Sequence, residues 1–152
     1  GTFASEKDRI ERRQVAAAKT GNPFTFLSTE TVRYSSAAAA QSAQKELVKT
    51  LAKCIIDKGY TETTGTKVAY TFTDIKSQPT GLVAEGSRVL VRTQIGLGKD
   101  ARQLLAFYQF NGEIFTGLYI MTAGEKGFTD LQVSSWHKVA VTMAARLSGK
   151  PA

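Results

Sequence analysis

The chain has 152 residues, which is the length of one domain and enough to bury a core. Hydrophobic residues make up 42% of the sequence and charged residues 22%, an ordinary globular composition without a membrane-spanning apolar run. The net charge is +7, from 20 basic and 13 acidic side chains, but no block of Lys and Arg concentrates it, so composition does not favour a nucleic-acid-binding protein.

The N-terminal segment predicts a charged helix over residues 4–18, with a thin apolar side. The turn signal Gly21-Asn22-Pro23 ends this helix, because Pro lacks a backbone N–H and disfavours helix in the residue before it. We therefore divide the chain into a charged N-terminal helix or linker (1–22), suited to connect to an upstream membrane anchor, and a single α+β domain (23–152).

A strand and a long helix are predicted next. Aromatic and β-branched residues dominate 24–34, which is typical of a β-strand. Ser35 or Ser36 then caps a helix that runs to about Asp57. Apolar residues at helical spacing form its buried stripe: Ala40, Ala43, Leu47, Leu51, Cys54 and Ile55. We expect Cys54, the only cysteine, to be a buried thiol without a disulfide.

Four further strands are predicted in the middle of the chain, the last two forming a hairpin. Alternating residues predict strands over 67–75 and 87–95. The strongest local signal is the hairpin over 102–121, because Asn111-Gly112 suits a two-residue type I′ turn.

That turn would pair Phe110 with Glu113 and Tyr108 with Phe115. Both faces of the resulting ribbon are rich in apolar residues, whereas a hairpin with one wet face would alternate apolar and polar. The hairpin must therefore be covered on both sides by helices, by a partner, or on one side by a ligand.

The last predicted element is a helix to Leu147, which Thr129 and Gln132 begin with a capping box and Phe128 can staple onto Val133. The order α-β-α-β-β-β-β-α predicts an α+β fold. We expect a mainly antiparallel, curved sheet of about five strands with two long helices packed on one face.

No constellation of catalytic residues is visible. His137, the only histidine, neighbours Trp136 on the last helix and has no nucleophile motif pointing to it. The glycine pair in Gly96-Leu-Gly98-Lys99 lacks the P-loop spacing and predicts a turn. One His and one Cys do not favour a transition-metal site. We therefore expect no catalytic residue, no metal and no cofactor, so the protein is not predicted to be an enzyme.

The remaining signal is aromatic. The strands carry more aromatic side chains than one helical layer must cover, which allows an apolar pocket with a few polar tips between sheet and helices. The candidate ligand-binding residues are Phe72, Tyr108, Phe115, Tyr119 and Trp136.

The stretch 29–54 carries a family resemblance: a strand that ends in Tyr34, an Ala-rich helix, and Cys54 at its end. It resembles the PknH-like extracellular sensor domains of actinobacterial receptor kinases and secreted lipoproteins. The Arg-bearing strand after Gly86 and the Trp-bearing last helix are compatible, so the likeness extends loosely over 29–147. This resemblance implies a sensor domain outside the cytoplasm and transfers no ligand residues.

We expect a non-catalytic extracytoplasmic domain, secreted or membrane-anchored, that senses or binds a small amphipathic molecule or a cell-envelope component. A second hypothesis is a protein–protein assembly module that uses an apolar face of the sheet. A third is a small enzyme on an NTF2-like scaffold, in which His137, Glu113 or Asp74 would converge inside a pocket.

Overall fold

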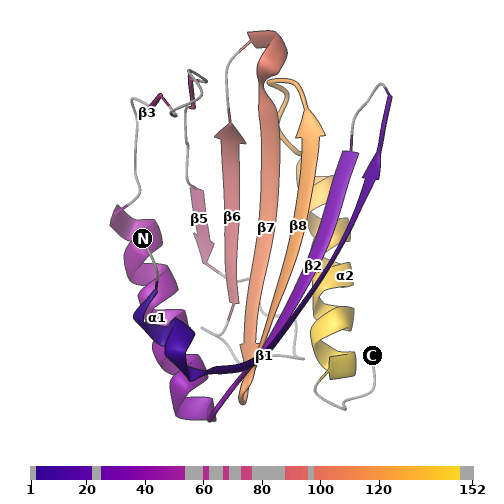
Figure 1. Cartoon of the computed structure of the whole chain (residues 1–152). Coiled ribbons are helices and arrows are strands. Elements are labelled where there is room, and N and C mark those ends of the chain that lie inside the picture. The colour runs from indigo at the N-terminus through magenta and orange to yellow at the C-terminus, as the bar shows by residue number, and fades with distance from the viewer. Residues whose placement is uncertain are drawn as a thin grey trace.

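The protein is built around a six-stranded antiparallel sheet with strand order β1-β2-β8-β7-β6-β5 (Figure 1). The computed structural model describes residues 3–21, 25–53, 60–61, 67–68, 73–76, 88–95 and 98–147. The sheet strands are β1 (Arg9–Lys19), β2 (Thr25–Tyr34), β5 (Thr73–Lys76), β6 (Arg88–Ile95), β7 (Arg102–Asn111) and β8 (Ile114–Ala123). The other elements are the pair β3 (Tyr60–Thr61) and β4 (Lys67–Val68), the helices α1 (Ala37–Lys53) and α2 (Asp130–Leu147), and the 3-10 turns η1 (Ala4–Asp8) and η2 (Gly98–Asp100).

The predicted α+β class, the antiparallel sheet and the two long helices are confirmed. The strand predicted over 87–95 is β6, and β4 and β5 lie within or next to the strand predicted over 67–75. The end of the second predicted helix, with Cys54 and Asp57, lies outside the described residues. In the part of the chain that the structure describes, no helix is long and apolar enough to cross a membrane.

The helix predicted over residues 4–18 is wrong. Residues 4–8 form the 3-10 turn η1, and β1 then pairs antiparallel with β2 along nearly its whole length. Beyond Arg9 every residue of β1 is exposed, so this edge strand can carry the charges that make the segment look helical in isolation. Pairing with β2 outweighs the local helix propensity of this segment.

The two long helices lie on opposite faces of the sheet, so the prediction that both pack on one face is wrong (Figure 1). The side chains buried with α1 are Val32, Tyr34, Ala40, Ala43, Phe110 and Phe115. The side chains buried with α2 are Leu105, Phe107, Leu118, Ile120, Val133 and Ala140. Successive residues of a strand point to opposite faces, and both faces of the β7–β8 hairpin are apolar, so each face requires its own helix.

The hairpin faces are as predicted, but its register is not. Phe110 pairs with Phe115, and Asn111 still lies in the ladder, opposite Ile114. The two loop residues are Gly112 and Glu113, and Gly112 has φ +58° while no described non-glycine residue has positive φ. A type I′ turn needs positive φ at both loop positions. This turn has positive φ only at the first position, Gly112, which is typical of a type II′ turn. The pairing shifts by two residues, which keeps every side chain on its predicted face.

Both helices begin with the caps that the sequence predicts. The Ser36 hydroxyl accepts a hydrogen bond from the Ala39 N–H at 3.1 Å. In α2 the Thr129 N–H donates to Gln132 Oε1 at 2.8 Å, and the Gln132 N–H donates to Thr129 Oγ1 at 3.3 Å. This reciprocal pair is a capping box, which satisfies two backbone donors at the start of the helix.

Thr129→Ala is expected to lower the free energy of unfolding by about 1 kcal/mol, because it removes half of the capping box. Ser135→Ala is the matched control: Ser135 is exposed within α2 and its hydroxyl only donates back to the Leu131 carbonyl. Urea unfolding of the two variants measures the difference. Equal stability of both variants would show that the box does not stabilise α2.

Candidate functional site

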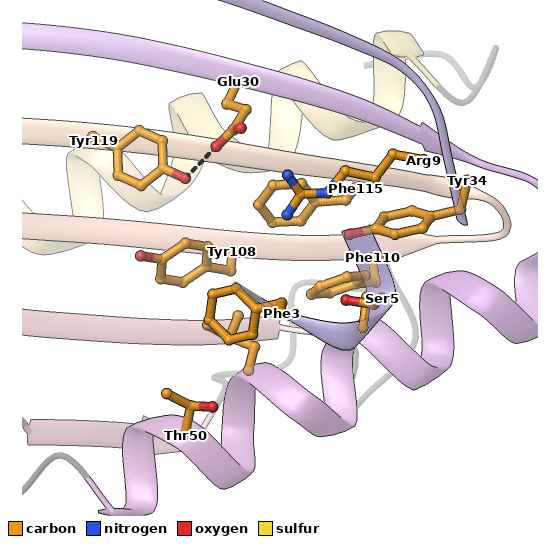
Figure 2. A pocket seen from close by; sticks show the side chains of 12 residues that line it. Phe3, Ser5, Arg9, Glu30, Tyr34, Thr50, Tyr108, Phe110, Phe115 and Tyr119 are labelled. Atoms are coloured by element: carbon orange, nitrogen blue, oxygen red, sulfur yellow. Dashed lines mark hydrogen bonds between the residues drawn. The ribbon is translucent and has the colours of Figure 1, made fainter. Parts of the chain in front are cut away.

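A pocket of about 310 Å³ lies between η1, α1 and the sheet face that α1 covers (Figure 2). This volume is at the small end of the range for ligand sites. Its walls combine apolar side chains of α1, such as Leu47, with polar groups from the N-terminal segment and β2. Six aromatic side chains line it: Phe3, Tyr34, Tyr108, Phe110, Phe115 and Tyr119.

The floor of the pocket is a set of rings from β7 and β8. Phe110 and Phe115 lie 4.9 Å apart between ring centroids, and Tyr108 is stacked on Phe115 at 6.0 Å. Tyr119 meets Tyr108 edge-on at 5.7 Å. Alternate positions of the two strands share one face, which is why these side chains converge.

Gly117 is the position that lets Tyr119 reach its partner. Gly117 lies directly between Tyr108 of β7 and Glu30 of β2 in the sheet register. The Tyr119 ring folds over it, so a Cβ added at Gly117 would lie 2.5 Å from the Tyr119 hydroxyl oxygen. The hydroxyl then donates a 2.7 Å hydrogen bond to Glu30 Oε2.

Glu30 is held from both sides. Its Oε1 accepts a hydrogen bond from Arg12 Nε, and Oε2 accepts the Tyr119 hydroxyl. Arg12 also donates from Nη2 to Gln14 Oε1 at 2.9 Å. The Glu30 hydrogen bond and charge raise the pKa of the Arg12 guanidinium. The carboxylate at the pocket wall is therefore paired with a cation from β1.

Two of the pocket tyrosines, Tyr108 and Tyr119, hold their protons strongly. Burial, and next the charge of Glu30, raises the pKa of Tyr108 to about 12. Burial, followed by the neighbouring Tyr108 and Glu30, raises the pKa of Tyr119 further. Neither phenol is poised to act as a base or nucleophile near neutral pH.

The N-terminal turn η1 closes one side of the pocket. The Glu46 carboxylate of α1 accepts the backbone N–H groups of Ala4 at 2.7 Å and Ser5 at 3.0 Å, and these bonds lower the pKa of Glu46. The Ser35 N–H donates to the Asp8 carbonyl at 2.9 Å. These contacts fix η1 against α1 and carry Phe3 to the pocket wall.

A register irregularity after Arg9 places two arginines on the pocket face. Arg9 pairs with Tyr34 and Arg12 with Val32, although residues three apart in a regular strand point to opposite faces. A bulge that re-aims a side chain in this way is frequent at functional sites. Figure 2 shows the Arg9 side chain pointing into the pocket.

The structure brings together three of the five predicted ligand-binding residues: Tyr108, Phe115 and Tyr119. Grouping Trp136 with them is wrong, because Trp136 packs against the α2 cluster on the opposite face of the sheet. Phe72 lies outside the described residues.

The polar wall of the pocket, which includes Arg9 and Glu30, was not predicted from the sequence. Glu30 alternates with Val32 and Tyr34 on β2, so the strand pattern could have placed Glu30 on the same sheet face as these two residues. No such pattern could have placed Arg9, because its segment was predicted to be helical.

Two of the three residues considered for an enzyme, His137 and Glu113, do not line the pocket. His137 of α2 stacks on Phe107 at 5.8 Å between ring centroids, on the opposite face. Glu113 is exposed in the hairpin loop, and the Asp74 side chain lies outside the described residues. Within the described ranges, no group of three or more His, Cys, Asp or Glu residues could hold a metal ion.

Gly117→Ala is expected to displace the Tyr119 ring and break its hydrogen bond to Glu30, lowering the free energy of unfolding by about 2 kcal/mol. Gly127→Ala is the control, since among the described residues a Cβ there meets nothing within 4 Å; its effect should stay within about 0.5 kcal/mol. Urea unfolding measures both. Wild-type stability of Gly117→Ala would contradict the role given to Gly117.

Alkaline titration should show two late-ionising tyrosines. Because the pKa of Tyr108 is raised to about 12 in the folded protein against 10 in a free tyrosine, folding stability is full below pH 10 and falls as pH rises from there. Absorbance at 295 nm should therefore show two phenols that ionise only as the protein unfolds. Tyr108→Phe and Tyr119→Phe should each remove one of them, and ionisation of every tyrosine near pH 10 in folded protein would be the opposite result.

Comparison with known proteins supports the fold. The sequence matches no family model and no curated protein. Among solved structures, the chain is similar to the extracellular domain of PknH from Mycobacterium tuberculosis, with a TM-score of 0.57 and 12% sequence identity. The match covers 93% of this chain and 67% of that one. The predicted resemblance to a PknH-like extracellular domain is thus confirmed at the level of the fold.

Proposed function

We propose that this chain is a non-catalytic sensor or ligand-binding domain whose pocket binds a small amphipathic molecule or a cell-envelope component. The observation that carries the proposal is the pocket itself, where six aromatic side chains form an apolar surface beside Arg9 and Glu30. An apolar cavity with a few polar groups at one side is the usual design of a small-molecule site.

The chemistry of the pocket favours binding over catalysis. Its carboxylate is paired with Arg12, and burial raises the pKa values of Tyr108 and Tyr119. A general base or nucleophile needs the opposite, a group that gives up its proton near the working pH.

The fold similarity to an extracellular domain supports placing this domain outside the cytoplasm, either secreted or attached to the membrane through another segment. It also fits a sensor role, in which occupancy of the pocket is the signal. The assembly-module alternative is less favoured, because α1 and α2 already cover the two apolar faces of the hairpin.

The proposal predicts that an uncharged apolar probe, 2-naphthylmethanol, binds in the pocket. Titration followed by ¹H–¹⁵N NMR should shift amides around Tyr108, Phe115 and Tyr119. Leu47→Trp should weaken binding roughly tenfold or more, because the larger ring fills the space beside α1. Val48→Trp is the matched control, since the neighbouring side chain is 42% exposed and does not line the pocket.

Saturable binding that responds to Leu47→Trp and not to Val48→Trp supports the proposal. Shifts confined to the α2 face, or no binding at millimolar probe, would contradict it.

A further inference from the structure

The two charged side chains of the pocket differ in how fully other residues pair with them. Arg9 and Glu30 are the charged side chains among its lining residues. Both oxygens of Glu30 accept hydrogen bonds, and the carboxylate is paired with Arg12. Arg9 is the less engaged of the two, because its ion pair with Glu6 is longer at 3.5 Å.

Within the described part of the chain, the guanidinium of Arg9 has one buried donor without a partner. Its Nη1 lies 3.5 Å from Glu6 Oε1, an ion pair between partly exposed side chains. Its Nε is buried and, among the described residues, has no hydrogen-bond acceptor. A buried donor without an acceptor is unfavourable, so a ligand oxygen that accepts from Nε would gain more than an ordinary surface contact.

The nearby carboxylates Glu46 and Glu6 do not accept a hydrogen bond from Arg9 Nε. Glu46 has both oxygens on the backbone N–H groups of η1. Glu6 meets Arg9 from its own short turn at Nη1. The side of the guanidinium that carries Nε is one that binds a carboxylate or phosphate by two parallel hydrogen bonds.

We propose that the ligand is a small apolar or aromatic molecule that carries an anionic oxygen group, and that Arg9 binds this group while the rings of the pocket hold the apolar body. This inference rests on the proposed function, because it assigns the charge of the molecule that occupies the same pocket. Arg9 is brought to the pocket face by the irregularity at the start of β1, which a regular strand would not do.

The test compares three probes that share one apolar body: 2-naphthoate, 2-naphthylmethanol and 2-naphthylmethylamine. On the wild-type chain the carboxylate should bind about tenfold or more tighter than the alcohol, and the amine weakest. Arg9→Gln should abolish the preference for the carboxylate and leave the affinity of the alcohol within about twofold.

Two further variants separate this from a structural effect of Arg9. Glu6→Gln should strengthen naphthoate binding, because it removes the carboxylate that competes for the guanidinium. Arg13→Gln on the same strand should change nothing, since its side chain is 82% exposed and paired with Glu11.

The outcomes distinguish the two proposals. If the alcohol binds in the pocket and naphthoate binds no tighter, the anion preference is wrong and the pocket function stands. If the amine binds best, Glu30 and not Arg9 recognises the ligand. If none of the probes shifts the pocket amides, the proposed function fails as well.

Discussion

The β7–β8 hairpin is apolar on both faces, and both faces must be shielded from water. The arrangement of the two long helices follows from this requirement. Each face would expose large side chains to water unless another layer covered it. Leu105, Leu118 and Ile120 are almost fully buried beneath α2, and Phe110 and Phe115 are buried beneath α1. The sheet therefore forms the middle of three layers, and a pocket can arise only where one covering layer is incomplete.

The α1 side leaves the gap that forms the aromatic pocket. This helix contributes the small side chains Ala40 and Ala43 to its core cluster, and Gly117 leaves room on the sheet below. The Tyr119 ring takes that room and turns its hydroxyl towards Glu30, which anchors a large side chain at the edge of the space. Small residues on the helix thus explain why a cavity persists among so many rings, and the missing side chain at Gly117 gives the Tyr119 ring its place at the edge of that cavity.

The sequence predicted what depends on local periodicity. Alternation along the hairpin gave the two apolar faces, and the Thr129–Gln132 spacing gave the start of α2. The same alternation implies that two apolar faces need a cover on each side. The prediction that both helices pack on one face did not take this into account. The misplacement of Trp136 followed from that error, because the strand pattern does not say which helix covers which face.

The N-terminal segment could not be predicted in the same way, because its structure comes from a partner strand and not from its own pattern. Exposed on both faces beyond Arg9, β1 has no apolar alternation to reveal it, yet it pairs with β2 over ten residue pairs from Arg9–Tyr34 to Lys19–Thr25. This edge strand supplies the cation that holds Glu30 and, through the irregularity beside Arg9, a second cation at the pocket. The positive charge at the pocket therefore comes from the segment whose sequence resembles a linker, while the apolar surface comes mainly from the hairpin.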